Sequence, residues 1–146
     1  MDPTIQALHD YWCSLREGLP PRRKAFEFMD IYKLAPNLLL SERVAPATFR
    51  FAYCGTTVAD NLPRDLTGLV FAPQTARVTA VDFAQLYMEI LGTPCWRFTR
   101  YAVDWPNAEY GSYLLGAGPL ADEDGTLKYV LSCAVFQEKS PFAPRV

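Results

Sequence analysis

The architecture of this chain depends most on one segment near its end, which reads Leu127-Lys128-Tyr129-Val130-Leu131-Ser132-Cys133-Ala134-Val135-Phe136. Successive side chains of a β-strand point to opposite faces, and here both faces are largely apolar. Such a strand is typical of a sheet that is covered on both sides. Helices from the middle of the chain can cover one face. The other face then needs an N-terminal helix, a second subunit, or both.

Two further strands are predicted just before this segment, at residues 95–103 and 110–120. The connections that separate the three strands are rich in turn-forming residues, first Trp105-Pro106-Asn107 and then Asp122-Glu123-Asp124-Gly125. Short connections of this kind join neighbouring antiparallel strands. The last part of the chain is therefore predicted to form a three-stranded meander.

An earlier hairpin is predicted from residues 38–40 and 48–54, in which Phe49, Phe51 and Tyr53 alternate onto one face. Residues Asp65, Thr67 and Gly68 then predict a structural turn, because a side-chain oxygen can accept from a nearby amide and glycine can reverse the chain. A core helix is predicted between residues 73 and 92, with one face formed by Ala80, Phe83, Ala84, Tyr87 and Leu91. Two strands, a helical middle and three more strands define an α+β domain, with an antiparallel sheet and helices on one face.

The chain begins with an amphipathic helix. Asp2 can cap it, Pro3 suits its first position, and an apolar stripe follows at helical spacing, made of Ile5, Leu8, Trp12 and Leu15. Because such a stripe cannot remain in water, we expect it to pair two copies of the chain. The expected organisation is a helix at 1–18, a linker at 19–36, the main domain at 37–138 and a flexible tail at 139–146.

Composition excludes several classes of function. A chain of 146 residues is long enough for one domain, and 50% of its residues are hydrophobic and 14% aromatic, which excludes intrinsic disorder. The 14 basic and 16 acidic residues give a net charge of -2, which disfavours binding to nucleic acid or to anionic membranes. No stretch approaches the ~20 apolar residues of a membrane span, and no signal peptide is evident, so we expect a cytoplasmic protein.

The sequence offers no obvious metal, cofactor or catalytic centre. Its four cysteines, at positions 13, 54, 95 and 133, form no CxxC motif, and His9 is its one histidine. We therefore expect free thiols, no metal and no assigned cofactor, and the sequence leaves an unknown small ligand, such as a noncovalently bound flavin, open. A nucleophilic triad cannot be assembled either, so no catalytic residue is assigned and the protein is not expected to be an enzyme. The alternative is a small enzyme that uses Asp or Tyr for acid/base chemistry in an aromatic pocket.

Several local motifs resemble a known family. They are Tyr11-Trp12, Leu15-Arg16, Gly18, Arg22-Arg23, Asp30-Ile31, Leu34, Pro36, Phe49-Arg50-Phe51, Gly55-Thr56 and Arg64-Asp65-Leu66-Thr67-Gly68. Together they resemble a bacterial, mainly alphaproteobacterial, family of single-domain PAS proteins of unassigned function. The resemblance implies a five-stranded antiparallel sheet in the order 2-1-5-4-3, with a pocket between the sheet and its helices. The sequence departs from the family pattern at Phe28, Tyr32, Asn37 and Pro63, so no role is carried over at those positions.

The excess of aromatic residues indicates where a ligand pocket could lie. The candidate lining residues are Phe51, Tyr53, Phe83, Tyr87, Trp96, Phe98, Tyr113 and Tyr129. A closely packed aromatic core without a ligand is the alternative. We expect a sensor or regulatory module that binds a small organic ligand or a partner protein, forms a homodimer through its N-terminal helix, and acts through a downstream regulatory protein.

Overall fold

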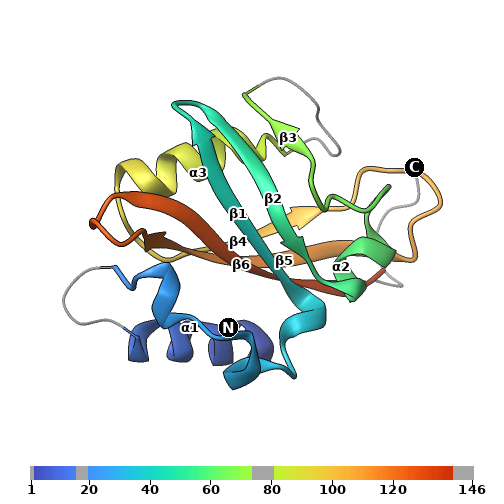
Figure 1. Cartoon of the computed structure of the whole chain (residues 1–146). Coiled ribbons are helices and arrows are strands. Elements are labelled where there is room, and N and C mark those ends of the chain that lie inside the picture. Colours follow the sequence, from blue (N-terminus) through green and yellow to red (C-terminus); the bar gives the residue numbers. More distant parts are fainter. Residues whose placement is uncertain (1, 16–19, 74–80, 140–146) are drawn as a thin grey trace.

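The computed structural model describes residues 2–15, 20–73 and 81–139 of the chain (Figure 1). Within these residues a single six-stranded sheet has the order β3-β2-β1-β6-β5-β4, and every pair of neighbours is antiparallel. The strands are β1 (Leu38–Ala45), β2 (Thr48–Cys54), β3 (Val70–Phe71), β4 (Arg97–Ala102), β5 (Tyr110–Ala121) and β6 (Leu127–Glu138). The predicted α+β class and the predicted order of five strands are confirmed.

The sheet has one strand more than predicted, since β3 pairs with β2 at its edge. Only Val70 and Phe71 belong to it, opposite Arg50 and Phe49. A strand of two residues shows no periodicity in sequence, so pattern analysis could not find it. Its pairing depends on a neighbour that is more than 15 residues away along the chain.

Helices lie on both sides of this sheet, and Figure 1 shows α1 and α3 on opposite sides of it. The helices are α1 (Pro3–Ser14), α2 (Thr56–Asn61) and α3 (Phe83–Gly92), with short 3-10 turns at Arg23–Ala25, Phe28–Ile31 and Ala35–Asn37. The Asp82 carboxylate caps α3 by accepting from the amide of Gln85 at 3.1 Å. Residues 74–80, where the sequence predicts the start of the core helix, lie outside the described residues.

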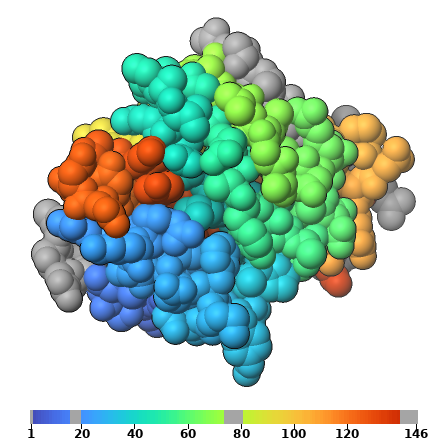
Figure 2. All heavy atoms as spheres, in the orientation of Figure 1, coloured from blue at the N-terminus to red at the C-terminus, as the bar shows by residue number. Residues whose placement is uncertain are grey.

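The amphipathic helix α1 covers the sheet face that α3 leaves open. The Asp2 carboxylate caps it by accepting from the amide of Thr4 at 2.8 Å. Ile5, Leu8 and Trp12 are 0%, 0% and 4% exposed, and the Trp12 indole donates to the carbonyl of Pro119 at 3.0 Å. The apolar stripe predicted from the sequence is therefore buried against β5 and β6 of its own chain. In Figure 2 the dark blue atoms of this N-terminal segment show at the lower edge of the molecule, next to the lighter blue residues that follow from position 20.

Two glycines of β5 allow α1 to approach this closely. A Cβ atom at Gly116 would lie 2.5 Å from Cγ2 of Ile5, and one at Gly118 would lie 2.8 Å from the Trp96 ring and 2.9 Å from the Trp12 ring. Any larger residue would therefore push α1 away from the sheet. The absence of a side chain at these positions is what the helix requires.

The turn that contains Asp65, Thr67 and Gly68 leads from α2 to β3. The Asp65 carboxylate accepts from both the amide and the hydroxyl of Thr67, at 2.9 and 2.8 Å, and Gly68 has a φ of 82°. The Gly68 amide then donates to the carbonyl of Phe51 at 2.8 Å. These bonds direct the chain back toward the edge of β2. The two bonds from Thr67 also lower the pKa of the Asp65 carboxyl, and the bond from the amide has the larger effect.

Gly118→Ala is expected to lower the free energy of unfolding by about 1–3 kcal/mol, because the added methyl group overlaps two indole rings. Urea denaturation followed by tryptophan fluorescence measures this loss. Gly92→Ala is the control, since a Cβ atom there has nothing within 4 Å and alanine favours a helix over glycine. If Gly118→Ala is as stable as Gly92→Ala, the close approach of α1 is refuted.

Asp65→Ala is expected to lower the melting temperature near neutral pH, because the turn loses both acceptor bonds. The pKa of this carboxyl is lower in the folded state than its ordinary value of 3.8, so its contribution is present above that pH and is lost as the pH falls through the folded-state pKa. The difference between Asp65→Ala and the wild type should therefore shrink below pH 3.8. Asp65→Asn keeps an acceptor oxygen and should show a smaller effect that does not depend on pH. A difference of constant size across this range would contradict the assignment.

Candidate functional site

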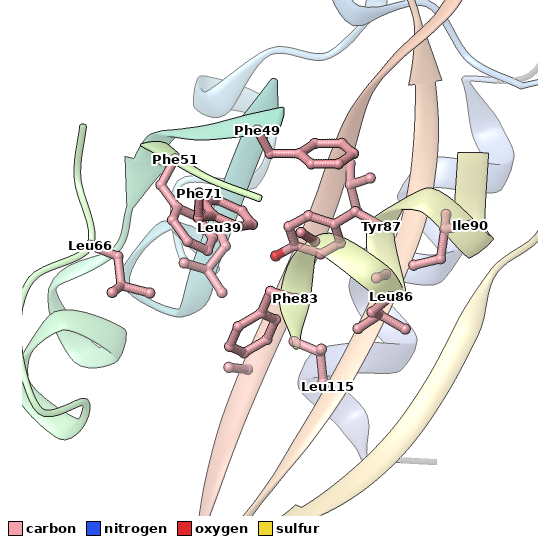
Figure 3. Packing of buried hydrophobic residues seen from close by; sticks show 14 of the residues in the cluster. Leu39, Phe49, Phe51, Leu66, Phe71, Phe83, Leu86, Tyr87, Ile90 and Leu115 are labelled. Carbon is pink, nitrogen blue, oxygen red and sulfur yellow. The ribbon is translucent and has the colours of Figure 1, made fainter. Parts of the chain in front are cut away.

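A cluster of aromatic rings fills the layer between α3 and the sheet (Figure 3). Its rings come from β2, β3 and α3, and they are Phe49, Phe51, Phe71, Phe83 and Tyr87. We call this set the ring cluster. Phe51 stacks on Phe71 with 4.6 Å between ring centroids, and Tyr87 meets Phe49 edge to face at 5.6 Å. Offset and edge-to-face contacts of this kind add to the stability gained from burial alone.

Tyr87 gives this apolar layer a polar centre. The residue is completely buried, and Figure 3 shows its hydroxyl pointing from α3 into the middle of the ring cluster. Burial raises the pKa of Tyr87 to about 12, and the nearby hydroxyls of Ser41 and Ser132 oppose that rise. The phenol therefore stays protonated, and therefore neutral, at physiological pH.

The structure brings only three of the eight predicted pocket residues together here, namely Phe51, Phe83 and Tyr87. The other five lie elsewhere. Tyr53, Trp96 and Tyr129 pack with α1 on the opposite face, and Phe98 is 43% exposed. Tyr113 is buried beside Tyr101, Trp105 and Phe136, at 5.4, 6.1 and 5.7 Å between ring centroids. The eight rings therefore do not line a single pocket.

A β-bulge explains why Tyr53 leaves the predicted face. Leu40 is opposite Tyr53 but Ser41 is opposite Phe51, so the pairing of β1 and β2 skips one residue. An extra residue in one strand reverses the alternation beyond it. Tyr53 therefore faces α1, where its hydroxyl donates to the carbonyl of Ala35 at 2.8 Å. The predicted placement of Phe49, Phe51 and Tyr53 on one face is wrong for Tyr53.

The aromatic and hydroxyl-bearing residues of this layer that were not among the predicted pocket residues include Phe49, Phe71, Ser41 and Ser132. Phe49 could have been found, because it alternates with Phe51 on the same strand. Phe71 could not, since its strand is too short to show a pattern. Both serines are 0% exposed. The signal that could have pointed to them is their position within otherwise apolar strands, where a serine places a hydroxyl group in the core.

The dimer residues predicted on the N-terminal helix lie in a second cluster, on the α1 face of the sheet. Ile5, Leu8 and Trp12 are buried there, and the partly buried Leu15 packs against them. His9 also lies here, with its ring centroid 5.0 Å from that of Trp96 and its Nε2 atom 3.5 Å from the Cys13 sulfur. Aromatic residues thus occupy both sides of the sheet, in two separate layers.

One surface hollow of about 330 Å³ lies where the end of α2 meets the loop between β4 and β5. Asp60, Asn61, Trp105, Asn107 and Glu109 are among the residues that line it. None of the five rings of the ring cluster lines this hollow.

Groups suited to holding a metal ion are not gathered in the described part of the chain. No set of three His, Cys, Asp or Glu residues among the described residues is placed to hold a metal ion. The thiols of Cys13, Cys54, Cys95 and Cys133 are free, and burial raises the pKa of Cys133 to about 12. Where a carboxyl pKa clearly shifts, at Glu42, Asp65 and Asp124, it is lowered.

None of the described helices is both long and apolar enough to cross a membrane.

Comparison with known proteins assigns the family. No curated protein matches the chain. Among solved structures, the chain is similar to the PAS domain of BvgS from Bordetella pertussis, with 16% identity, a TM-score of 0.46, and coverage of 90% of this chain and 88% of that one. A family model described as PAS domain matches residues 1–103, which is more than half of the chain. The chain therefore belongs to the PAS domain family.

Proposed function

We propose that this protein is a sensor or regulatory module that binds a small organic ligand in the ring cluster between α3 and the sheet. The observation that carries the proposal is the composition of that layer. Four phenylalanine rings from three separate elements surround the completely buried Tyr87 and its hydroxyl. Apolar walls with a few polar groups are typical of small-molecule sites. Membership of the PAS domain family supports a signalling role.

The proposed output is a change in how the module meets a partner protein. Val44 and Val70 are 48% and 51% exposed at the end of the β1–β2 hairpin and on the edge strand β3. β3 pairs with β2, which carries two rings of the cluster, so a shift of those rings on ligand binding would move this edge. We propose that a downstream regulatory protein detects that movement and that the module itself carries out no catalysis. The cytoplasmic location and the narrower alphaproteobacterial relationship stay predictions.

Dimerisation through the N-terminal helix also stays a prediction. Because Ile5, Leu8 and Trp12 already pack on their own sheet, a dimer through this stripe would have to exchange α1 between two copies. Exchange would preserve every contact of α1, including the bond from Trp12 to Pro119.

A ligand that binds the ring cluster should stabilise the fold by about 2.7 kcal/mol at a concentration 100 times its Kd. A thermal-shift screen of small organic compounds measures this effect. Phe83→Leu, within the ring cluster, should weaken binding of any hit. Phe98→Leu is the matched control, because that ring is 43% exposed on β4. If no compound shifts the melting temperature, or if both variants weaken binding equally, the proposed site is wrong.

Sedimentation equilibrium at micromolar concentration tests the dimer. Exchange of α1 predicts a mass of twice 16.5 kDa. Gly118→Ala weakens the packing of α1 on the sheet, so it should then shift the equilibrium between monomer and dimer. Gly92→Ala should leave that equilibrium unchanged. A mass of 16.5 kDa for the wild type over the whole concentration range contradicts dimerisation.

A further inference from the structure

Two serines on neighbouring central strands lie beneath α3. Ser41 of β1 is opposite Val130 of β6, and Ser132 of β6 is opposite Leu39 of β1, so the two serines are diagonal neighbours. Both are 0% exposed. Diagonal residues on one face of an antiparallel pair are within reach of a long side chain that packs across them.

Tyr87 is that long side chain. Its hydroxyl lies close enough to both serines for their hydroxyls to influence its pKa. Even so, none of the three hydroxyl oxygens makes a well-formed hydrogen bond with any other described residue. Three hydroxyls, all on fully buried residues, thus come together from α3, β1 and β6, near enough to interact but without a hydrogen bond of good geometry between them.

Such an arrangement is costly unless something else completes it. A buried polar group without a partner destabilises a protein, so native structures rarely keep even one. Among the described residues, the other buried side chains of this layer are apolar and offer these hydroxyls no partner. A buried water molecule commonly makes about three hydrogen bonds, so three converging hydroxyls define a place for one polar atom.

We propose that the hydroxyls of Ser41, Tyr87 and Ser132 form a neutral subsite that receives one oxygen atom of the ligand. This inference rests on the proposed function, and it adds the chemical class of the ligand. The ligand would be an uncharged molecule with an apolar body and an alcohol, phenol or ketone oxygen. Each hydroxyl can both donate and accept, so the subsite suits any of these oxygens.

The surroundings favour a neutral ligand over a charged one. A buried ion needs an opposite charge, and the residues of the buried cluster carry none. Among the described residues, Arg43 brings a cation to the ring cluster, with its guanidinium over the Phe49 ring at 5.6 Å from its centroid. The Arg43 guanidinium therefore packs on the Phe49 ring, and the three hydroxyls form a separate set of uncharged groups.

Toluene and p-cresol test the subsite, because they differ by a single hydroxyl group. In a purely apolar site, p-cresol would bind more weakly than toluene, since its hydroxyl would lose water without compensation. We expect wild-type protein to bind p-cresol at least as tightly as toluene, measured by NMR titration of the methyl groups. Tyr87→Phe, which removes only the phenolic oxygen, should weaken p-cresol binding about fivefold to tenfold and leave toluene unchanged.

Tyr53→Phe is the matched control, because its hydroxyl lies on the opposite face and donates to Ala35. It should change the affinity for neither probe. Ser41→Ala and Ser132→Ala each remove one further hydroxyl of the subsite. Each is expected to weaken the binding of p-cresol and to leave the binding of toluene unchanged.

The outcomes separate this inference from the proposed function. Tighter binding of toluene than of p-cresol, unaffected by the three deletions, would overturn the subsite and leave an apolar ligand site standing. A water molecule held permanently by the three hydroxyls would give this same result. Binding of neither probe would overturn both the subsite and the proposed ligand site in the ring cluster.

Discussion

The indole of Trp12 donates across the helix–sheet boundary to the Pro119 carbonyl, and it can reach that oxygen because Gly118 has no side chain. This contact seats α1 on the sheet. Strands β5 and β6 carry apolar residues on both faces, so one of those faces would otherwise be left in water. Burial of an exposed apolar face is the dominant gain in folding. The N-terminal helix thus completes the same unit as the sheet it covers.

With α1 covering one face, the other face is left to α3 and to the ring cluster. The two layers are separated by the alternation of the central strands, in which Leu38 and Leu40 face α1 while Leu39 and Ser41 face α3. The bulge between β1 and β2 adjusts this division, since it sends Tyr53 to the α1 layer and leaves Phe51 in the ring cluster. One extra residue in a strand therefore decides which rings could meet a ligand.

Charge is arranged around these layers rather than within them. Glu42 bonds to Arg50 at 3.0 Å and to Lys128 at 3.2 Å, which links β1, β2 and β6 at the partly exposed edge of the α1 face. Arg97 bonds to Glu89 at 2.9 Å, which joins β4 to α3 on the other side. Exposed pairs of this kind contribute little to stability. Among the described residues, the buried polar side chains of the α3 layer are the hydroxyls of Ser41, Tyr87 and Ser132, while the Arg43 guanidinium lies over the Phe49 ring.

Local pattern was sufficient to predict five of the six strands and the main helices, because alternation and helical spacing are properties of neighbouring residues, whereas the order of the strands came from the resemblance to PAS proteins. It also identified the stripe of α1, and Phe51, Phe83 and Tyr87 as candidate pocket residues. It could not divide eight aromatic residues between two layers, since that depends on the bulge at Ser41 and on which face each strand presents after pairing. Nor could it show that α1 covers its own sheet, or that Ser41, Ser132 and Tyr87 converge. Contacts between residues more than 40 positions apart are fixed only when the whole chain packs.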